Sequence, residues 1–227
     1  FLSPTTSGEA LSGSVGAGID SPTYVVVVKN IEVTPPADSG SEVTLTGHSS
    51  VLDTLNWFDN FVFDLNLGLA ENIEIGATGS LYHLKFQFLG SPRSSPKAGE
   101  WVGSIIGDYF NGSRSSSSSS SSNTFKTEYT GSGGSLSVGY RKAKNVIIYL
   151  SASHLAFSAD TTIIQVSPSG TFNYTGEGKQ RNASLGIRKE EPQGFFIAFE
   201  WSYSKTEWEQ LEAKEYGSVG LLAGASW

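Results

Sequence analysis

The sequence predicts an all-β protein, and in particular a closed antiparallel transmembrane up-and-down β-barrel that forms a single domain over residues 1–227. Three observations predict this fold. Large apolar residues alternate with small or polar residues, with a period of two, along much of the chain. No stretch approaches the roughly 20 consecutive apolar residues that a membrane helix needs. Charged residues make up only 16% of the chain, which is low for a water-exposed surface, and 26 glycines suit a crowded barrel interior.

The alternation is clearest in residues 61–69 and 194–204. One strand face of the first segment carries Phe61, Phe63, Leu65, Leu67 and Leu69, and one face of the second carries Phe195, Ile197, Phe199, Trp201 and Tyr203. The residues between them are mostly small, polar or charged. A soluble β-sandwich also alternates, but here aromatic residues stand at the ends of the apolar faces, as rings at a lipid–water interface do. The pattern therefore favours the membrane version.

Composition excludes several classes of function. The net charge of −7 argues against a nucleic-acid partner. The chain has no cysteine, only three histidines and no HExxH spacing, so we expect no metal site and no cofactor. The chain starts at Phe1 and contains no methionine, so we interpret it as a mature product whose signal peptide has been removed.

Applied to the whole chain, the alternation predicts about twelve strands. They lie near residues 10–19, 22–34, 42–53, 60–69, 72–79, 81–89, 98–110, 124–141, 144–158, 171–189, 194–208 and 213–227. An even number returns both termini to the periplasmic side. Ten strands are the alternative, reached if residues 72–89 form one long strand and residues 98–110 lie in an outer loop.

The connections between these strands differ in length. Residues 70–72, 141–145 and 190–194 are short and polar, as periplasmic turns are. Residues 111–123 include a run of eight serines and are expected to form a flexible extracellular loop, because such a run cannot bury enough apolar area to offset its ordering entropy. Residues 34–41 and 91–98, each with two prolines, are unusually long for periplasmic turns in the twelve-strand layout.

The last strand carries a more specific pattern. Its apolar face consists of Val219, Leu221, Ala223, Ala225 and the terminal Trp227. A closing strand of this kind resembles the assembly signal of Gram-negative bacterial outer-membrane β-barrel proteins. The resemblance implies an outer-membrane location and recognition by the barrel-assembly machinery during insertion. It also implies contact with outer-membrane lipid and lipopolysaccharide, and it leaves room for a protein partner in the envelope.

Charged residues on the polar strand faces form a candidate lumen network. Its predicted members are Asp64, Glu74, Lys85, Arg141, Arg188 and Glu200. Charges at this depth are costly unless they are paired or hydrated, so we expect ion pairs among them. Such a network either plugs a narrow barrel or sets the charge preference of a small pore.

One pair of residues suggests catalysis. His48 and Ser50 share a face of the strand near residues 43–52. Their spacing resembles the arrangement in outer-membrane phospholipase and lipid A deacylase, where an imidazole takes the serine proton during ester hydrolysis. Here the pair falls on the same face as Thr44 and Thr46, which we expect to face the lumen, so packing is the simpler interpretation.

Together these patterns favour a non-catalytic outer-membrane barrel that acts as a narrow channel for small solutes or as a membrane anchor. The alternatives are a structural subunit of a larger envelope complex and a lipid ester hydrolase that uses His48 and Ser50. The architecture alone hosts all of these functions.

Overall fold

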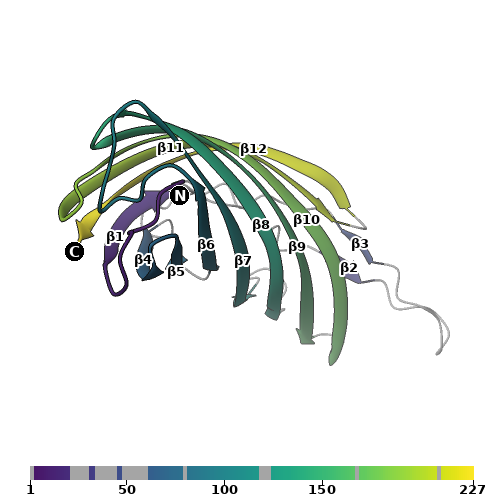
Figure 1. Cartoon of the computed structure of the whole chain (residues 1–227). Coiled ribbons are helices and arrows are strands. Elements are labelled where there is room, and N and C mark those ends of the chain that lie inside the picture. Colours follow the sequence, from purple (N-terminus) through teal and green to yellow (C-terminus); the bar gives the residue numbers. More distant parts are fainter. Residues whose placement is uncertain are drawn as a thin grey trace.

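A computed structural model describes residues 3–20, 31–33, 45–47, 61–78, 81–117, 124–166, 169–208 and 211–227. Ten strands form a closed antiparallel barrel (Figure 1). They are β1 (Gly13–Asp20), β4 (Phe61–Ala70), β5 (Ile73–Thr78), β6 (Leu81–Leu89), β7 (Glu100–Ser117), β8 (Thr124–Ala143), β9 (Val146–Val166), β10 (Ser169–Glu190), β11 (Gly194–Trp208) and β12 (Leu211–Ser226). The described residues include no helix that is long and apolar enough to cross a membrane.

The prediction of a closed antiparallel barrel is confirmed, with the alternative count of ten strands rather than twelve. β1 pairs directly with β4 and β12, so the barrel closes without the segments expected as strands near residues 22–34 and 42–53. Within those segments, β2 (Ile31–Val33) and β3 (Leu45–Gly47) pair with each other in a separate two-stranded sheet.

The route to ten strands differs from the predicted one. Residues 72–89 form two strands, β5 and β6, rather than one, and residues 98–110 contribute to β7 rather than to an outer loop. β7 also continues through residues 111–117, which the sequence placed in a serine-rich loop. Backbone pairing with β8 down to Ser117–Thr124 carries the strand onward even where the residues have little apolar character. Residues 118–123 lie outside the described part.

The strands are staggered as closure requires. Directly paired residues lead from Ser14 through every strand to Lys214 on β12, whereas Ser14 itself pairs with Ser226, an offset of 12 residues (226 minus 214). A stagger of this kind goes with strands that tilt by about 35–45°. The end of the barrel that holds Gly13, Ser226 and the turns at 71–72, 144–145 and 191–193 is called the terminal rim below, and the opposite end the far rim.

The two sides of the barrel differ in height. β7, β8, β9 and β10 contain 18, 20, 21 and 22 residues, whereas β1, β4, β5 and β6 contain 8, 10, 6 and 9. The long strands therefore reach well beyond the short ones at the far rim (Figure 1).

The exterior is apolar, which is the reverse of a water-soluble protein. Among the described residues, thirty large hydrophobic side chains are exposed and only ten hydrophobic residues are buried. On β11 the outward residues from Phe195 to Tyr203 extend about 27 Å along the strand at ~3.4 Å per residue. That length gives about 20 Å across a membrane at a tilt of ~40°, close to the apolar band of known membrane barrels. The chain is a transmembrane barrel.

Aromatic side chains in the lumen lie on glycines of neighbouring strands. Five such pairs are directly opposite in the sheet: Tyr149 with Gly186, Phe157 with Gly178, Phe110 with Gly131, Tyr129 with Gly112, and Phe196 with Gly224. A Cβ added to any of these glycines would lie 2.2–2.7 Å from the opposing ring. The glycines therefore leave the space that the rings occupy, and the rings cover wall positions that lack a side chain.

Candidate functional site

The lumen near the terminal rim is filled by the start of the chain itself. Residues 3–8 are buried, and we call this segment the N-terminal plug. It enters beside β4, where the backbone of Gly68 exchanges hydrogen bonds with Leu11 and Ser12. A side chain at Gly68 would overlap the carbonyl oxygen of Glu9 and the Ser7 hydroxyl, so a glycine is needed where the segment passes the wall.

The loop between β6 and β7 packs against the plug. Ser91, Pro92 and Arg93 of this loop are buried, and the Arg93 amide donates to the Thr6 carbonyl oxygen at 2.9 Å. Gly8 has a φ of +93°, and a Cβ there would lie 2.3 Å from Oγ of Ser94. The β6–β7 loop and the N-terminal plug are therefore closely packed against each other.

Wall side chains satisfy the polar groups of the plug. The Ser7 amide donates to Oε2 of Glu74 at 2.9 Å, and the Thr6 amide donates to Oε1 of Gln87 at 2.8 Å. The Thr5 hydroxyl donates to Oε1 of Glu190 at 3.1 Å. A segment with this many backbone donors and acceptors is stable inside a barrel only when they are paired in this way.

An ion-pair network surrounds the plug. Nζ of Lys85 lies 2.8 Å from Oε1 of Glu74, and Nε of Arg188 lies 2.8 Å from Oε2 of Glu190. Arg141 contacts Glu190 at 3.9 Å and Glu100 at 3.2 Å, and it donates to the Ser91 carbonyl oxygen at 2.9 Å. The carboxylate of Glu190 is therefore shared between two guanidinium groups and the plug.

Arg93 adds a further charge from the loop. Its side chain is buried and donates to the carbonyl oxygen of Gly13 at 3.3 Å. Burial lowers the pKa of this guanidinium, and the carboxylates of Glu190 and Glu74 oppose the shift. An arginine in this setting stays protonated at neutral pH, so Arg93 contributes a fixed positive charge to the plugged end.

The predicted lumen residues are only partly brought together. Glu74 and Lys85 pair with each other, whereas Arg141 and Arg188 pair with Glu190, which the sequence analysis did not select. The selected residue Glu200 accepts a hydrogen bond from the Tyr149 hydroxyl at 2.8 Å. Asp64, the remaining member, lies in a separate polar cluster.

That cluster links β4, β5 and β6. The Asn66 amide donates to Oδ2 of Asp64 at 2.6 Å, and the Thr78 hydroxyl donates to Oδ1 at 2.7 Å. Nε2 of His83 contacts Oδ1 of Asn66 at 2.8 Å. The histidine thus meets an amide rather than a serine hydroxyl, so the cluster does not contain the base–nucleophile contact that ester hydrolysis needs.

Two other predicted sites have different outcomes. His48 and Ser50 lie outside the described residues, so catalysis by that pair stays a prediction. On β12, Val219, Leu221, Ala223, Ala225 and Trp227 share the outward face, and the backbone of Trp227 exchanges two hydrogen bonds of 3.1 Å with Gly13. The last residue thereby helps to close the barrel, while its recognition by assembly machinery stays a prediction. Among the described residues, no group of three His, Cys, Asp or Glu side chains is placed to hold a metal ion.

The residues that the sequence analysis missed carried weak signals. Glu190 follows Arg188 on the same strand face, so extending the alternation by one step finds it. The β6–β7 loop could have been suspected from the predicted connection at residues 91–98, which is too long for a periplasmic turn. Glu100 becomes a partner of Arg141 only through the register of β7 and β8, and the plug, made of serine, threonine, proline and glycine, has no signal of its own.

The comparisons with known proteins found similar solved structures but no matching sequence. No family model and no curated protein matches the sequence. Among solved structures, the chain is similar to Ail, the attachment invasion locus protein of Yersinia pestis, with 11% identity, a TM-score of 0.38, and coverage of 96% of this chain and 99% of that one. It is also similar to the outer membrane channel DcaP of Acinetobacter baumannii, with 9% identity, a TM-score of 0.25, and 96% of both chains covered. The closed barrel and its apolar exterior are those of a transmembrane β-barrel.

Proposed function

We propose that the protein is a non-catalytic barrel of the Gram-negative outer membrane that works as a closed membrane anchor rather than as an open channel. With both termini at the terminal rim, that rim faces the periplasm and the far rim faces the cell exterior. The tall wall of β7–β10 is then the part that the anchor carries outside the cell.

The observation that carries this proposal is the filled lumen. The N-terminal plug and the buried part of the β6–β7 loop occupy the periplasmic end, and they are hydrogen-bonded to opposite parts of the wall, including β5, β6, β8 and β10. A solute has to displace paired and buried polar groups to pass this point. Such displacement is costly, so the resting protein should not conduct.

Planar-bilayer recording tests the anchor proposal. We expect the intact chain to insert without measurable conductance and a variant lacking residues 1–8 to conduct. Steady conductance of the intact chain would contradict the proposal. Separation of cell envelopes by density, with the protein followed in the outer-membrane fraction, tests the location independently of conductance.

A narrow channel is the second candidate, and one observation favours it. Among the described side chains, the lumen wall carries three more carboxylates than cations: Asp64, Glu74, Glu100, Asp108, Glu190 and Glu200 against Lys85, Arg141 and Arg188. A pore with such a wall prefers cations. If the intact chain conducts, a reversal potential that favours cations over anions supports this candidate.

A further inference from the structure

The outward face of β9, β10 and β11 changes character at one level of the barrel. On β10, Ala183 lies opposite Ala152 of β9 and Tyr203 of β11, and these three residues end the apolar surface. In the next outward row toward the far rim, Arg181 lies opposite His154 and Lys205. We call His154, Arg181 and Lys205 the basic row. It places three nitrogen-bearing side chains next to one another directly above the apolar belt.

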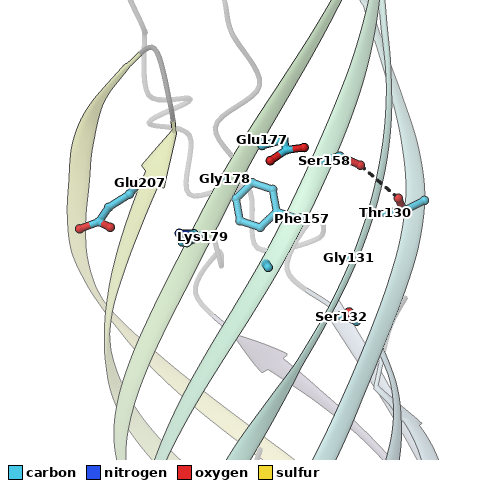
Figure 2. A pocket seen from close by; sticks show the side chains of 10 residues that line it. Thr130, Gly131, Ser132, Phe157, Ser158, Glu177, Gly178, Lys179 and Glu207 are labelled. Carbon is cyan, nitrogen blue, oxygen red and sulfur yellow. Dashed lines mark hydrogen bonds between the residues drawn. The ribbon is translucent and has the colours of Figure 1, made fainter.

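A groove lies immediately beyond the basic row. Its volume is about 570 Å³, and its outward lining consists of small side chains on β8 and β9 and charged ones on β10 and β11. The small residues are Thr130, Ser132, Ala156 and Ser158, and the charged ones are Glu177, Lys179 and Glu207. Figure 2 shows Thr130 and Ser158 joined by a hydrogen bond of 3.4 Å on neighbouring strands. The missing side-chain bulk leaves a polar hollow where a neighbouring molecule can lie against the wall.

In the described part of the chain, the outward Lys and Arg side chains of the far half gather on one side of the barrel. The outward Lys and Arg side chains described in the far half are Lys126, Lys179, Arg181 and Lys205, all on β8, β10 and β11. On the other side, the last exposed large hydrophobic residues toward the far rim on β4, β6 and β7 are Phe61, Tyr82 and Tyr109. Among the residues that the structure describes, the outward Lys and Arg side chains at this height therefore lie on this side only.

The ion pairs already present at the basic row are weak. Arg181 lies 3.8 Å from Glu207, and Lys205 lies 3.2 Å from Glu207 and 3.7 Å from Glu215. The Arg181 side chain is 62% exposed, and pairs between exposed side chains contribute little because water and salt screen them. The guanidinium can therefore turn to a phosphate, which it binds in a bidentate manner.

We propose that the basic row binds a phosphate group of lipopolysaccharide and that the adjacent groove takes a sugar of its core. This proposal rests on the outer-membrane location proposed above, which puts the row at the headgroups of the outer leaflet. The ligand has acyl chains that lie on the apolar belt, an anionic sugar phosphate at the level of Arg181, and polar sugars above it. A phospholipid supplies the first two features but has no sugar to fill the groove.

The test uses the full chain, stripped of bound lipid in detergent and titrated with lipopolysaccharide, with bound lipid measured by native mass spectrometry. The double variant Arg181→Gln/Lys205→Gln should weaken binding about tenfold or more, because two charge-assisted contacts are lost. The matched control is Lys142→Gln/Lys189→Gln, which removes the same charge from exposed residues at the terminal rim and should leave binding unchanged. Equal binding by both double variants would overturn the proposal.

Additional ligands separate the possible sources of phosphate. Dephosphorylated lipopolysaccharide should bind as weakly to the intact chain as normal lipopolysaccharide does to the double variant. If phosphatidylglycerol or inorganic phosphate competes as well as lipopolysaccharide does, the basic row is a general anion patch and the proposal fails.

A groove-filling variant tests the sugar contact. Ala156→Phe should weaken binding of lipopolysaccharide with its core sugars but leave lipid A without a core unaffected, and equal effects on both ligands would contradict the groove assignment. The single variants Arg181→Gln and Lys205→Gln serve if the double variant does not fold. Because conductance is unrelated to these outward residues, loss of lipid binding with a silent barrel would leave the anchor proposal standing.

Discussion

Near the terminal rim, the lumen is packed with charged side chains that neutralise one another around a polar segment of chain. Toward the far rim, at the level of Phe110 and Phe157, it is lined by aromatic rings that lie on glycines. The ring centroid of Phe110 lies 6.2 Å from that of Phe157 and 6.1 Å from that of Tyr129, so the three rings form a connected apolar layer. The lumen is therefore filled by inserted chain and ion pairs at one level, whereas at the other level its wall is covered by aromatic rings.

The difference follows from what each level has to hold. A plug of six residues brings unpaired backbone donors and acceptors into the lumen, and only side chains such as Glu74, Gln87 and Glu190 can satisfy them. The aromatic rings lie on glycines of neighbouring strands, so they only have to cover wall positions that lack a side chain. Removal of one charge at the plugged level should therefore lower the free energy of unfolding more than the addition of one methyl group at the aromatic level does.

The largest effect is expected for Glu190→Gln. The change leaves Arg141 and Arg188 with less opposing charge while both remain buried, at side-chain exposures of 0% and 5%. Breaking a buried ion pair from one side costs about 3–5 kcal/mol of unfolding free energy. Urea unfolding in micelles, followed by tryptophan fluorescence, measures the loss. If Glu190→Gln lowered the free energy of unfolding less than Gly178→Ala does, the plugged level would be the less sensitive of the two, and the expectation would be contradicted.

A smaller loss, about 1–3 kcal/mol, is expected for Gly178→Ala, because overpacking forces the neighbouring ring to move. The new Cβ would lie 2.5 Å from the ring of Phe157, which Figure 2 shows beside Gly178. Combining it with Phe157→Leu should recover part of the loss, which a double-mutant cycle detects. Gly217→Ala is the control, because the nearest atom to its Cβ lies 3.8 Å away.

How far the sequence predicts each level depends on the kind of signal. Strand alternation is a local property, so it located β6 and β11 at their observed bounds and placed Glu74, Lys85, Arg141 and Arg188 on the lumen side. The partners of Arg141 depend on register and on the inserted chain, which alternation does not encode. The barrel also closes without the strands predicted near residues 22–34 and 42–53. Val25–Val28 is apolar on both faces, so alternation could not fix its orientation relative to lipid.

Loosening the plug should have little effect on global stability but a large effect on access. Gly8→Ala combines a φ of +93° with a Cβ only 2.3 Å from Oγ of Ser94, so the plug has to shift. The chain has no cysteine, so a Thr6→Cys reporter provides a single thiol at a buried position. We expect labelling by a water-soluble thiol reagent to be about tenfold faster or more in the Gly8→Ala background. The reagent reaches the buried thiol only in molecules whose plug is displaced, so the labelling rate follows the fraction of such molecules.

The control for the plug variant is Gly107→Ala in the same reporter background. Its Cβ has no neighbour closer than 4.0 Å, so labelling should stay at the rate of the reporter alone. Equal labelling rates for Gly8→Ala and Gly107→Ala would mean that the plug tolerates a side chain at residue 8 and does not pack tightly against the β6–β7 loop.

The smallest effect is expected for Glu128→Gln, which makes the same carboxylate-to-amide change as Glu190→Gln but on the outer face. Glu128 lies 2.6 Å from Lys126, and the two side chains are 61% and 54% exposed. Water solvates both groups when the contact is lost, so the unfolding free energy should change by less than about 0.5 kcal/mol. The same urea titration measures it, at low and at high salt. A loss comparable to that of Glu190→Gln would mean that burial does not set the cost of a lost carboxylate here, and the contrast between the two levels of the lumen would then need another cause.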